Sequence, residues 1–265
     1  MAIADAQSMR ERIQPYLSRS LTAGNAFVVV SAASGTPSVA PDSLASLFGQ
    51  SLAPRIESGS APFPTSLGGV GVQIVDAAGK SVAVELLYAS PEQINFVVPP
   101  GITPGTATIN IVNGTGSVPS GTVQVEAVAP ALLTANGNGS GVVAATAYAT
   151  AIPTTMTFPV QVFQCGTAPG SCVSIPIDPG IDRPVTITLY ATGLRGRSSD
   201  SSVTLTIGTM NVPIRSITHG DDSGPLAGID QVTFGLPLNL RSLGEADIFL
   251  TVDGVDSNHG RINIQ

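Results

Sequence analysis

The sequence contains no tryptophan, and charged residues make up only 11% of its 265 positions. A helical protein uses Glu, Lys and Leu heavily, so this scarcity of charge disfavours an all-helical fold. Basic residues number 11 against 18 acidic ones, which gives a formal net charge of −7. Because nucleic-acid binders gain affinity by neutralising phosphates with clustered basic side chains, the charge balance argues against a nucleic-acid partner.

Long apolar runs are also missing. The longest, AFVVVSAA at residues 26–33, is much shorter than the about 20 residues that a membrane-spanning helix needs. The first 21 residues lack the apolar centre of a secretory signal. We therefore expect no membrane insertion, and the localisation has to be inferred from other features.

Turn formers and β-branched residues are abundant instead. The chain has 29 Gly and 21 Pro, with many Val, Ser and Thr, and 43% of its residues are apolar. Such a composition is typical of an all-β protein with many short strands. Seven strand-like runs with regularly spaced turn signals occupy residues 25–128, as expected for an immunoglobulin-like β-sandwich.

The chain repeats itself. QINFVVP at residues 93–99 aligns with QVTFGLP at 231–237 at an offset of 138, and LFGQSL at 47–52 aligns with LYATGL at 189–194 at an offset of 142. Small differences in offset indicate loop insertions between matched strands. The residues that mark the repeat are Gln93, Phe96 and Pro99 in the first copy and Gln231, Phe234 and Pro237 in the second.

The repeat and the length predict two tandem sandwiches. We place a short helix or linker at residues 1–24, the first immunoglobulin-like domain at 25–128 and the second at 129–265. The second domain carries an inserted cysteine hairpin at about residues 158–178.

The polar residues of the repeated segment look at first like a candidate active site. Alternation, however, puts Ile94, Phe96 and Val98 on one face of a strand and Gln93 and Asn95 on the other. We therefore interpret the segment as a core strand, with Gln93 and its counterpart in the second copy bonded to the backbone of a neighbouring loop.

The two cysteines stand in VFQCGTAPGSCVSIPI. Gly and Pro lie between Cys165 and Cys172, and apolar alternation flanks them, which favours a disulfide across a hairpin. A pair of reduced thiols is the alternative. A zinc site with His219 and His259 is disfavoured, because the paired ligand spacing of structural zinc is absent. A disulfide would indicate an oxidising compartment.

Several motifs resemble a known family. VVSAAS, LLYASPEQINFVVP and GTATINI in the first copy, and LYATGLRGRSS and GIDQVTFGLPLNL in the second, are similar to the Solibacter C-terminal family, which is found at the ends of many large acidobacterial proteins. The likeness covers about residues 27–265. It implies a secreted or envelope protein built from TIG-like (E-set-like) sandwiches, and it supplies no reaction.

No catalytic motif occurs in the chain. The sequence lacks a Gly-x-Ser-x-Gly elbow, a phosphate-binding loop and a His-Glu-x-x-His pair. His219 and His259 are the general-base candidates, and both are expected in exposed turns. We therefore predict a protein that is not an enzyme and needs no cofactor.

Acidic residues offer a weak calcium candidate. Asp221 and Asp222 are adjacent, and Asp200 and Asp230 are within reach in sequence, but their spacing is not that of an EF-hand. The simpler interpretation of this segment is a solvent-exposed acidic turn.

The remaining prediction is a structural or interaction module, outside the cell or at its surface, that serves as a spacer, an adhesion unit or a self-assembling subunit. Its edge strands offer contacts to protein partners. The AFVVVSAA run either pairs within its own domain or reaches into another subunit.

Carbohydrate binding is the alternative function. Sugar-binding sites usually present a platform of exposed aromatic rings, and this chain has no Trp. It has four tyrosines, at Tyr16, Tyr88, Tyr148 and Tyr190.

Overall fold

The computed structural model describes residues 13–14, 26–113 and 119–265. The predicted N-terminal helix or linker lies outside this part of the chain except for Ile13 and Gln14, which have helical backbone. The regular elements of the described residues are strands and two short 3-10 helices, so the all-β fold is confirmed. Within the same residues, no helix is long and apolar enough to cross a membrane.

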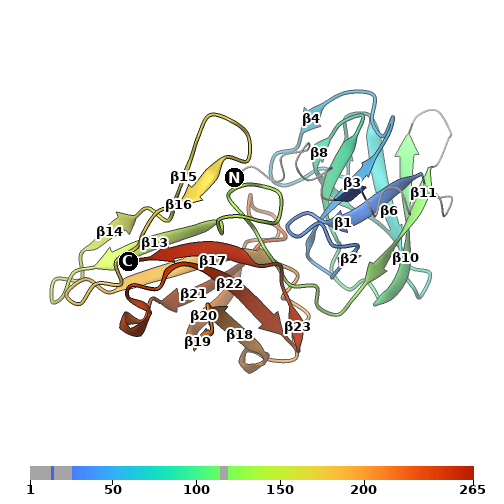
Figure 1. The fold of residues 1–265 in the computed structure, drawn as a ribbon. Coiled ribbons are helices and arrows are strands. Elements are labelled where there is room, and N and C mark those ends of the chain that lie inside the picture. Colours follow the sequence, from blue (N-terminus) through green and yellow to red (C-terminus); the bar gives the residue numbers. More distant parts are fainter. Residues whose placement is uncertain (1–12, 15–25, 114–118) are drawn as a thin grey trace.

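The first half of the chain forms two sheets and one lobe of the molecule (Figure 1). One sheet has the order β1-β3-β9-β8-β4, and the other has β2-β11-β10-β6-β5 with β7 beside β6. The strands are β1 (Phe27–Ser31), β2 (Ser38–Val39), β3 (Leu44–Gly49), β4 (Glu57–Ser58), β5 (Ser66–Leu67), β6 (Val70–Val75), β7 (Ser81–Ala83), β8 (Glu85–Ala89), β9 (Gln93–Val97), β10 (Gly105–Asn113) and β11 (Ser120–Val125).

The second half forms the other lobe (Figure 1). Its larger sheet has the order β14-β13-β17-β21-β20 with β12 beside β17, and it faces a sheet of order β19-β18-β22-β23 with β24 beside β22. The elements are β12 (Ala131–Leu132), β13 (Ala145–Thr150), β14 (Thr157–Val160), β15 (Phe163–Cys165), β16 (Cys172–Ser174), β17 (Val185–Thr192), η1 (Asp200–Ser202), β18 (Val203–Ile207), β19 (Met210–Val212), β20 (Ile214–His219), β21 (Asp230–Gly235), η2 (Leu238–Leu240), β22 (Gly244–Val252), β23 (Val255–Asp256) and β24 (Gly260–Ile264).

Each half has its own apolar core between its two sheets. In the first, Ile94 and Phe96 of β9 belong to the same buried cluster as Ile109 of β10. In the second, Phe234 of β21 shares a cluster with Leu250 of β22. Every sheet of the described chain lies wholly in one half. The arrangement is sandwich-like, while the count of two immunoglobulin-like domains stays a prediction.

The sequence repeat is also a repeat of strand pairing. Antiparallel β3 and β9 place Leu47 opposite Ile94, and antiparallel β17 and β21 place Leu189 opposite Val232. These four residues are the ones that the sequence alignment matches. The two halves therefore share the register of their central strands, and the alternation predicted for β9 holds.

The side chain of Gln93 does not make the predicted hydrogen bonds to a loop backbone. Its Nε2 donates to Oδ1 of Asn95 at 2.8 Å, and Oγ of Ser46 donates to the same oxygen at 2.8 Å. All three side chains are buried. Because the outer face of this sheet is covered, its polar side chains bond one another instead of a loop backbone. Gln231 is partly exposed.

Two groups of the described residues cover that outer face. Ile13 packs against Val28, Val30 and Phe48. Further along the same sheet, Leu44 and the end of β9 pack against the second half of the chain. All residues of β1 and β3 are consequently buried.

Candidate functional site between the two halves

The two lobes meet through an apolar cluster. Leu44 and Val97 of the first half contact Ala227 and Ile229, which lie just before β21 in the second half. Tyr190 of β17 is packed at the edge of this cluster and of a smaller one beside it. Burial of these side chains excludes water and ties the halves together.

A short chain of hydrogen bonds crosses the same interface. The amide of Leu44 donates to Oγ1 of Thr192 at 2.9 Å, and this hydroxyl donates to the carbonyl of Gly228 at 2.7 Å. Thr192 is fully buried. Gly228 has a φ of 74°, and a Cβ added there would lie 2.9 Å from Cδ2 of Leu44. The backbone conformation and the close approach both require glycine.

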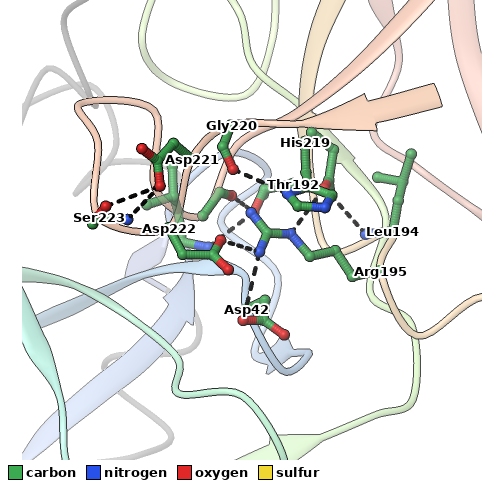
Figure 2. Close-up of polar contacts among 12 residues, drawn as sticks. Asp42, Thr192, Leu194, Arg195, His219, Gly220, Asp221, Asp222 and Ser223 are labelled. Carbon is green, nitrogen blue, oxygen red and sulfur yellow. Dashed lines mark hydrogen bonds and ion pairs between the residues drawn. The ribbon is translucent and has the colours of Figure 1, made fainter. Parts of the chain in front are cut away.

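Arg195 lies at the centre of the polar part of the interface (Figure 2). Its Nε is 3.2 Å from Oδ1 of Asp230, and its Nη1 is 2.5 Å from Oδ1 of Asp222. The same Nη1 is 3.6 Å from Oδ1 of Asp42, which belongs to the first half. Nη2 is buried and has no hydrogen-bond partner within the described part of the chain. We call Arg195, Asp42, Asp222 and Asp230 the Arg195 cluster.

The electrostatics of the Arg195 cluster are unbalanced, because three carboxylates surround one guanidinium. Burial raises the pKa of Asp230, against the opposing effects of the Leu194 amide and Arg195. Burial also raises the pKa of Asp42. Although burial lowers the pKa of Arg195, the carboxylates of Asp222, Asp230 and Asp42 together bring it above its usual value. By formal charge the four residues of the cluster are negative in sum, while Arg197 and His219 act on Asp230 and Asp42 from outside it.

A cleft of about 270 Å³ adjoins the cluster at the interface. Its walls are mainly apolar, and three carboxylates lie among them. The lining residues are Asp42, Val82, Ala83, Glu85, Val97, Pro99, Pro100, Asp222, Ala227 and Gly228. A second hollow, of about 310 Å³, is lined by Arg195, Arg197, Ser199, Asp200 and His219. These features suit non-covalent binding.

The aspartates considered for calcium have other partners. Asp222 pairs with Arg195, and Asp200 pairs with Arg197. Asp221 accepts hydrogen bonds from the amide and the hydroxyl of Ser223, at 3.1 and 2.9 Å. In the described ranges, no group of three His, Cys, Asp or Glu residues is arranged to hold a metal ion.

The two histidines are not equivalent. His219 ends strand β20 instead of lying in a loop, and its Nδ1 is 3.0 Å from the carbonyl oxygen of Gly220 (Figure 2). His259 stacks on Phe249, with 4.3 Å between the ring centroids. The structure thus places His219 at the end of β20 and His259 in the loop between β23 and β24, with separate contacts.

The disulfide between Cys165 and Cys172 is confirmed. The two residues face each other in the β15–β16 hairpin, which stands apart as a two-stranded sheet. Asn136 attaches the hairpin to the rest of its half, because its Nδ2 donates to the carbonyls of Gly170 and Cys172.

Reasoning from the sequence missed Arg195, although a signal was available. In the repeat alignment, Arg195 takes the place of Ala53 at the offset of 142, and Asp230 takes the place of Glu92 at the offset of 138. A basic residue that replaces a small apolar one in the second copy alone marks a position where the two copies differ in their surroundings. The partner in the first half, Asp42, has no such signal.

Neither a comparison with protein-family models nor a search among curated proteins finds a match for this chain. Membership in the Solibacter C-terminal family therefore stays a prediction based on the motifs quoted above.

Proposed function

We propose that this protein is a non-enzymatic structural or interaction module, outside the cell or in the cell envelope. The observation that carries the proposal is the buried interface between the halves. It combines apolar packing at Leu44 and Val97, the bond from Leu44 to Thr192 and the ion pairs of Arg195. Inter-domain contacts of this kind restrict relative motion, and a stiff unit is what a spacer or an assembly subunit requires.

The disulfide supports the proposed location. Disulfides persist in oxidising compartments and are rare in the cytosol, where thiols are kept reduced. The bridge between Cys165 and Cys172 closes an exposed hairpin. The resemblance to a secreted acidobacterial family, proposed from the motifs, leads to the same location.

Edge strands offer the surfaces for partners. In the larger sheet of the second half, β14 and β20 are at the two ends of the strand order. β14 contains Pro159, which removes one backbone donor from that edge. β20 is mostly exposed and has no proline, so we propose this edge as the one suited to strand addition. In the first half, β1 pairs with β3 of its own sheet.

Light scattering at increasing protein concentration, combined with electron microscopy, tests the proposal. We expect concentration-dependent assembly, and we expect it to weaken when His219, whose amide points away from β21 by the register of the pair, is replaced by proline. A monomer at all concentrations, together with small-angle scattering that shows the two halves moving independently, would contradict the proposed module.

Carbohydrate binding remains the second proposal, and Tyr148 favours it. Its side chain on β13 is 49% exposed, whereas Tyr88 is half-buried and Tyr190 is packed in the interface. A glycan array distinguishes the two functions. Specific binding that free sugar competes away, and that Tyr148→Ala abolishes, would support carbohydrate binding over the structural role.

A further inference from the structure

We propose that the cleft between the halves binds a cationic side chain of lysine or arginine type, presented by a partner polypeptide. This inference rests on the proposed role as an interaction module and names the chemistry of the partner. Clefts at domain interfaces are common ligand sites. At about 270 Å³, this one is slightly smaller than typical small-molecule pockets and is suited to a single side chain.

The walls of the cleft fit an aliphatic stem. Val97, Pro99 and Pro100 come from the end of β9 and the turn that follows it, while Val82 comes from β7. Ala227 closes the wall from the second half. Lysine and arginine bury their methylene stems along such apolar surfaces while their charged ends stay near polar groups.

The carboxylates that line the cleft favour a cationic ligand over a neutral one. Asp42 and Asp222 line it and share the single guanidinium of Arg195 with Asp230. Glu85 of β8, whose backbone pairs with Val97 of β9, adds the third carboxylate of the lining. A cation in the cleft would offset this surplus of negative charge. Lys80, whose Nζ lies close to Gly101, is not among the lining residues.

The test is a titration of isotope-labelled protein with Nα-acetyl-lysine methylamide, followed by NMR. We expect saturable shifts at Val97, Ala227 and Gly228, and similar shifts with the arginine derivative. The norleucine derivative, which keeps the aliphatic stem without the charge, should bind at least about tenfold more weakly if charge decides. Equal binding of the neutral derivative, or no shift at these three residues, would overturn the proposal.

Two variants locate the binding. Glu85→Gln should weaken lysine binding by about fivefold because it removes one of the three carboxylates that line the cleft. Ala83→Leu should abolish binding because it narrows the cleft without changing its charge. Glu245→Gln is the matched control, since Glu245 is exposed on β22 and bonds to Ser174. Amide spectra establish that each variant is folded. Unchanged binding by folded Ala83→Leu would place the site elsewhere and refute the cleft.

The result of the titration can be distinguished from the result of the test of the proposed function. Assembly and stiffness are measured by light scattering and small-angle scattering without any added peptide. Failure of the titration would remove the cationic partner and leave the structural role to its own test.

Discussion

At the scale of single residues, Arg195 shows how one charge organises an interface. Its partners come from three places: Asp42 from the turn before β3, Asp222 from the loop after β20, and Asp230 from the start of β21. Asp230 is 1% exposed, so its carboxylate depends on Arg195 and on the amide of Leu194. Removing one partner of a buried pair is costly because the other charge stays behind.

Replacing Arg195 with methionine should therefore destabilise the protein strongly. We expect a loss of about 3–5 kcal/mol in the free energy of unfolding, measured by urea denaturation, because Asp230 loses its cationic partner. Arg55→Met is the control. Arg55 pairs with Glu57 at 3.0 Å, but its side chain is 66% exposed, so the expected loss is about 0–1 kcal/mol. Equal losses in the two variants would contradict the role of burial.

The contributions of Asp42 and Asp76 to folding stability should depend on pH in opposite directions. Burial raises the folded-state pKa of Asp42 above 3.8, so its contribution to stability is fully present below pH 3.8 and declines as the pH rises through the raised value. Hydrogen bonding by the Thr103 amide lowers the pKa of Asp76 below 3.8, so its contribution is present above pH 3.8 and is lost as the pH falls.

Stability curves of Asp42→Asn and Asp76→Asn against pH test these signs. The difference between wild type and Asp42→Asn should decrease from pH 4 upward, and the difference for Asp76→Asn should decrease from pH 4 downward. Asparagine tolerates the φ of 61° at position 42, so the backbone stays unstrained. If the stability differences of the two variants changed with pH in the same direction, one of the two pKa shifts would be absent.

At the scale of elements, the sequence predicts the strands well where one face is buried. In β10, alternation of Ala107, Ile109 and Ile111 with polar residues matches the observed burial. In β1 and β3 the apolar pattern is nearly continuous, and the structure buries both faces. Continuous apolar runs indicate cover on both sides of a strand, but they do not identify what covers it.

The disulfide hairpin is an element whose stability depends on its bridge. A two-stranded hairpin alone is marginal in water. For the short loop between Cys165 and Cys172, separated by 7 positions, the chain-entropy model gives about 2.5 kcal/mol. In the double variant Cys165→Ser, Cys172→Ser, we expect hydrogen exchange to increase in β15 and β16, with protection of β17 and β21 unchanged. Loss of protection throughout the second half would show that the bridge supports the whole unit.

At the scale of the whole molecule, the interface is the part that the sequence does not predict. The offset of the repeat gives the register of β3 with β9 and of β17 with β21, because each pairing is local to its own half. The contact of Leu44 with the second half joins residues 148 positions apart, at Thr192, and neither strand pattern encodes it. The site lies where the copies contact each other, which self-comparison of the sequence cannot reveal.

A glycine at this contact provides the test of coupling between the halves. Gly228 and Gly254 both have positive φ, 74° and 81°, so valine is strained at either position. A Cβ at Gly228 would lie 2.9 Å from Leu44, whereas nothing lies within 4 Å of one at Gly254. Gly228→Val should therefore cost about 1–3 kcal/mol more than Gly254→Val, which is the typical cost of overpacking.

Calorimetry gives the readout for this pair of variants. Because the halves share a buried interface, we expect the wild type and Gly254→Val to unfold in one transition, with the midpoint lowered in the variant. In Gly228→Val the displaced Leu44 should separate the halves, so that two transitions appear and proteolysis becomes faster between β11 and β12. One transition in Gly228→Val, at the midpoint of Gly254→Val, would mean that the contact at Leu44 does not couple the two halves.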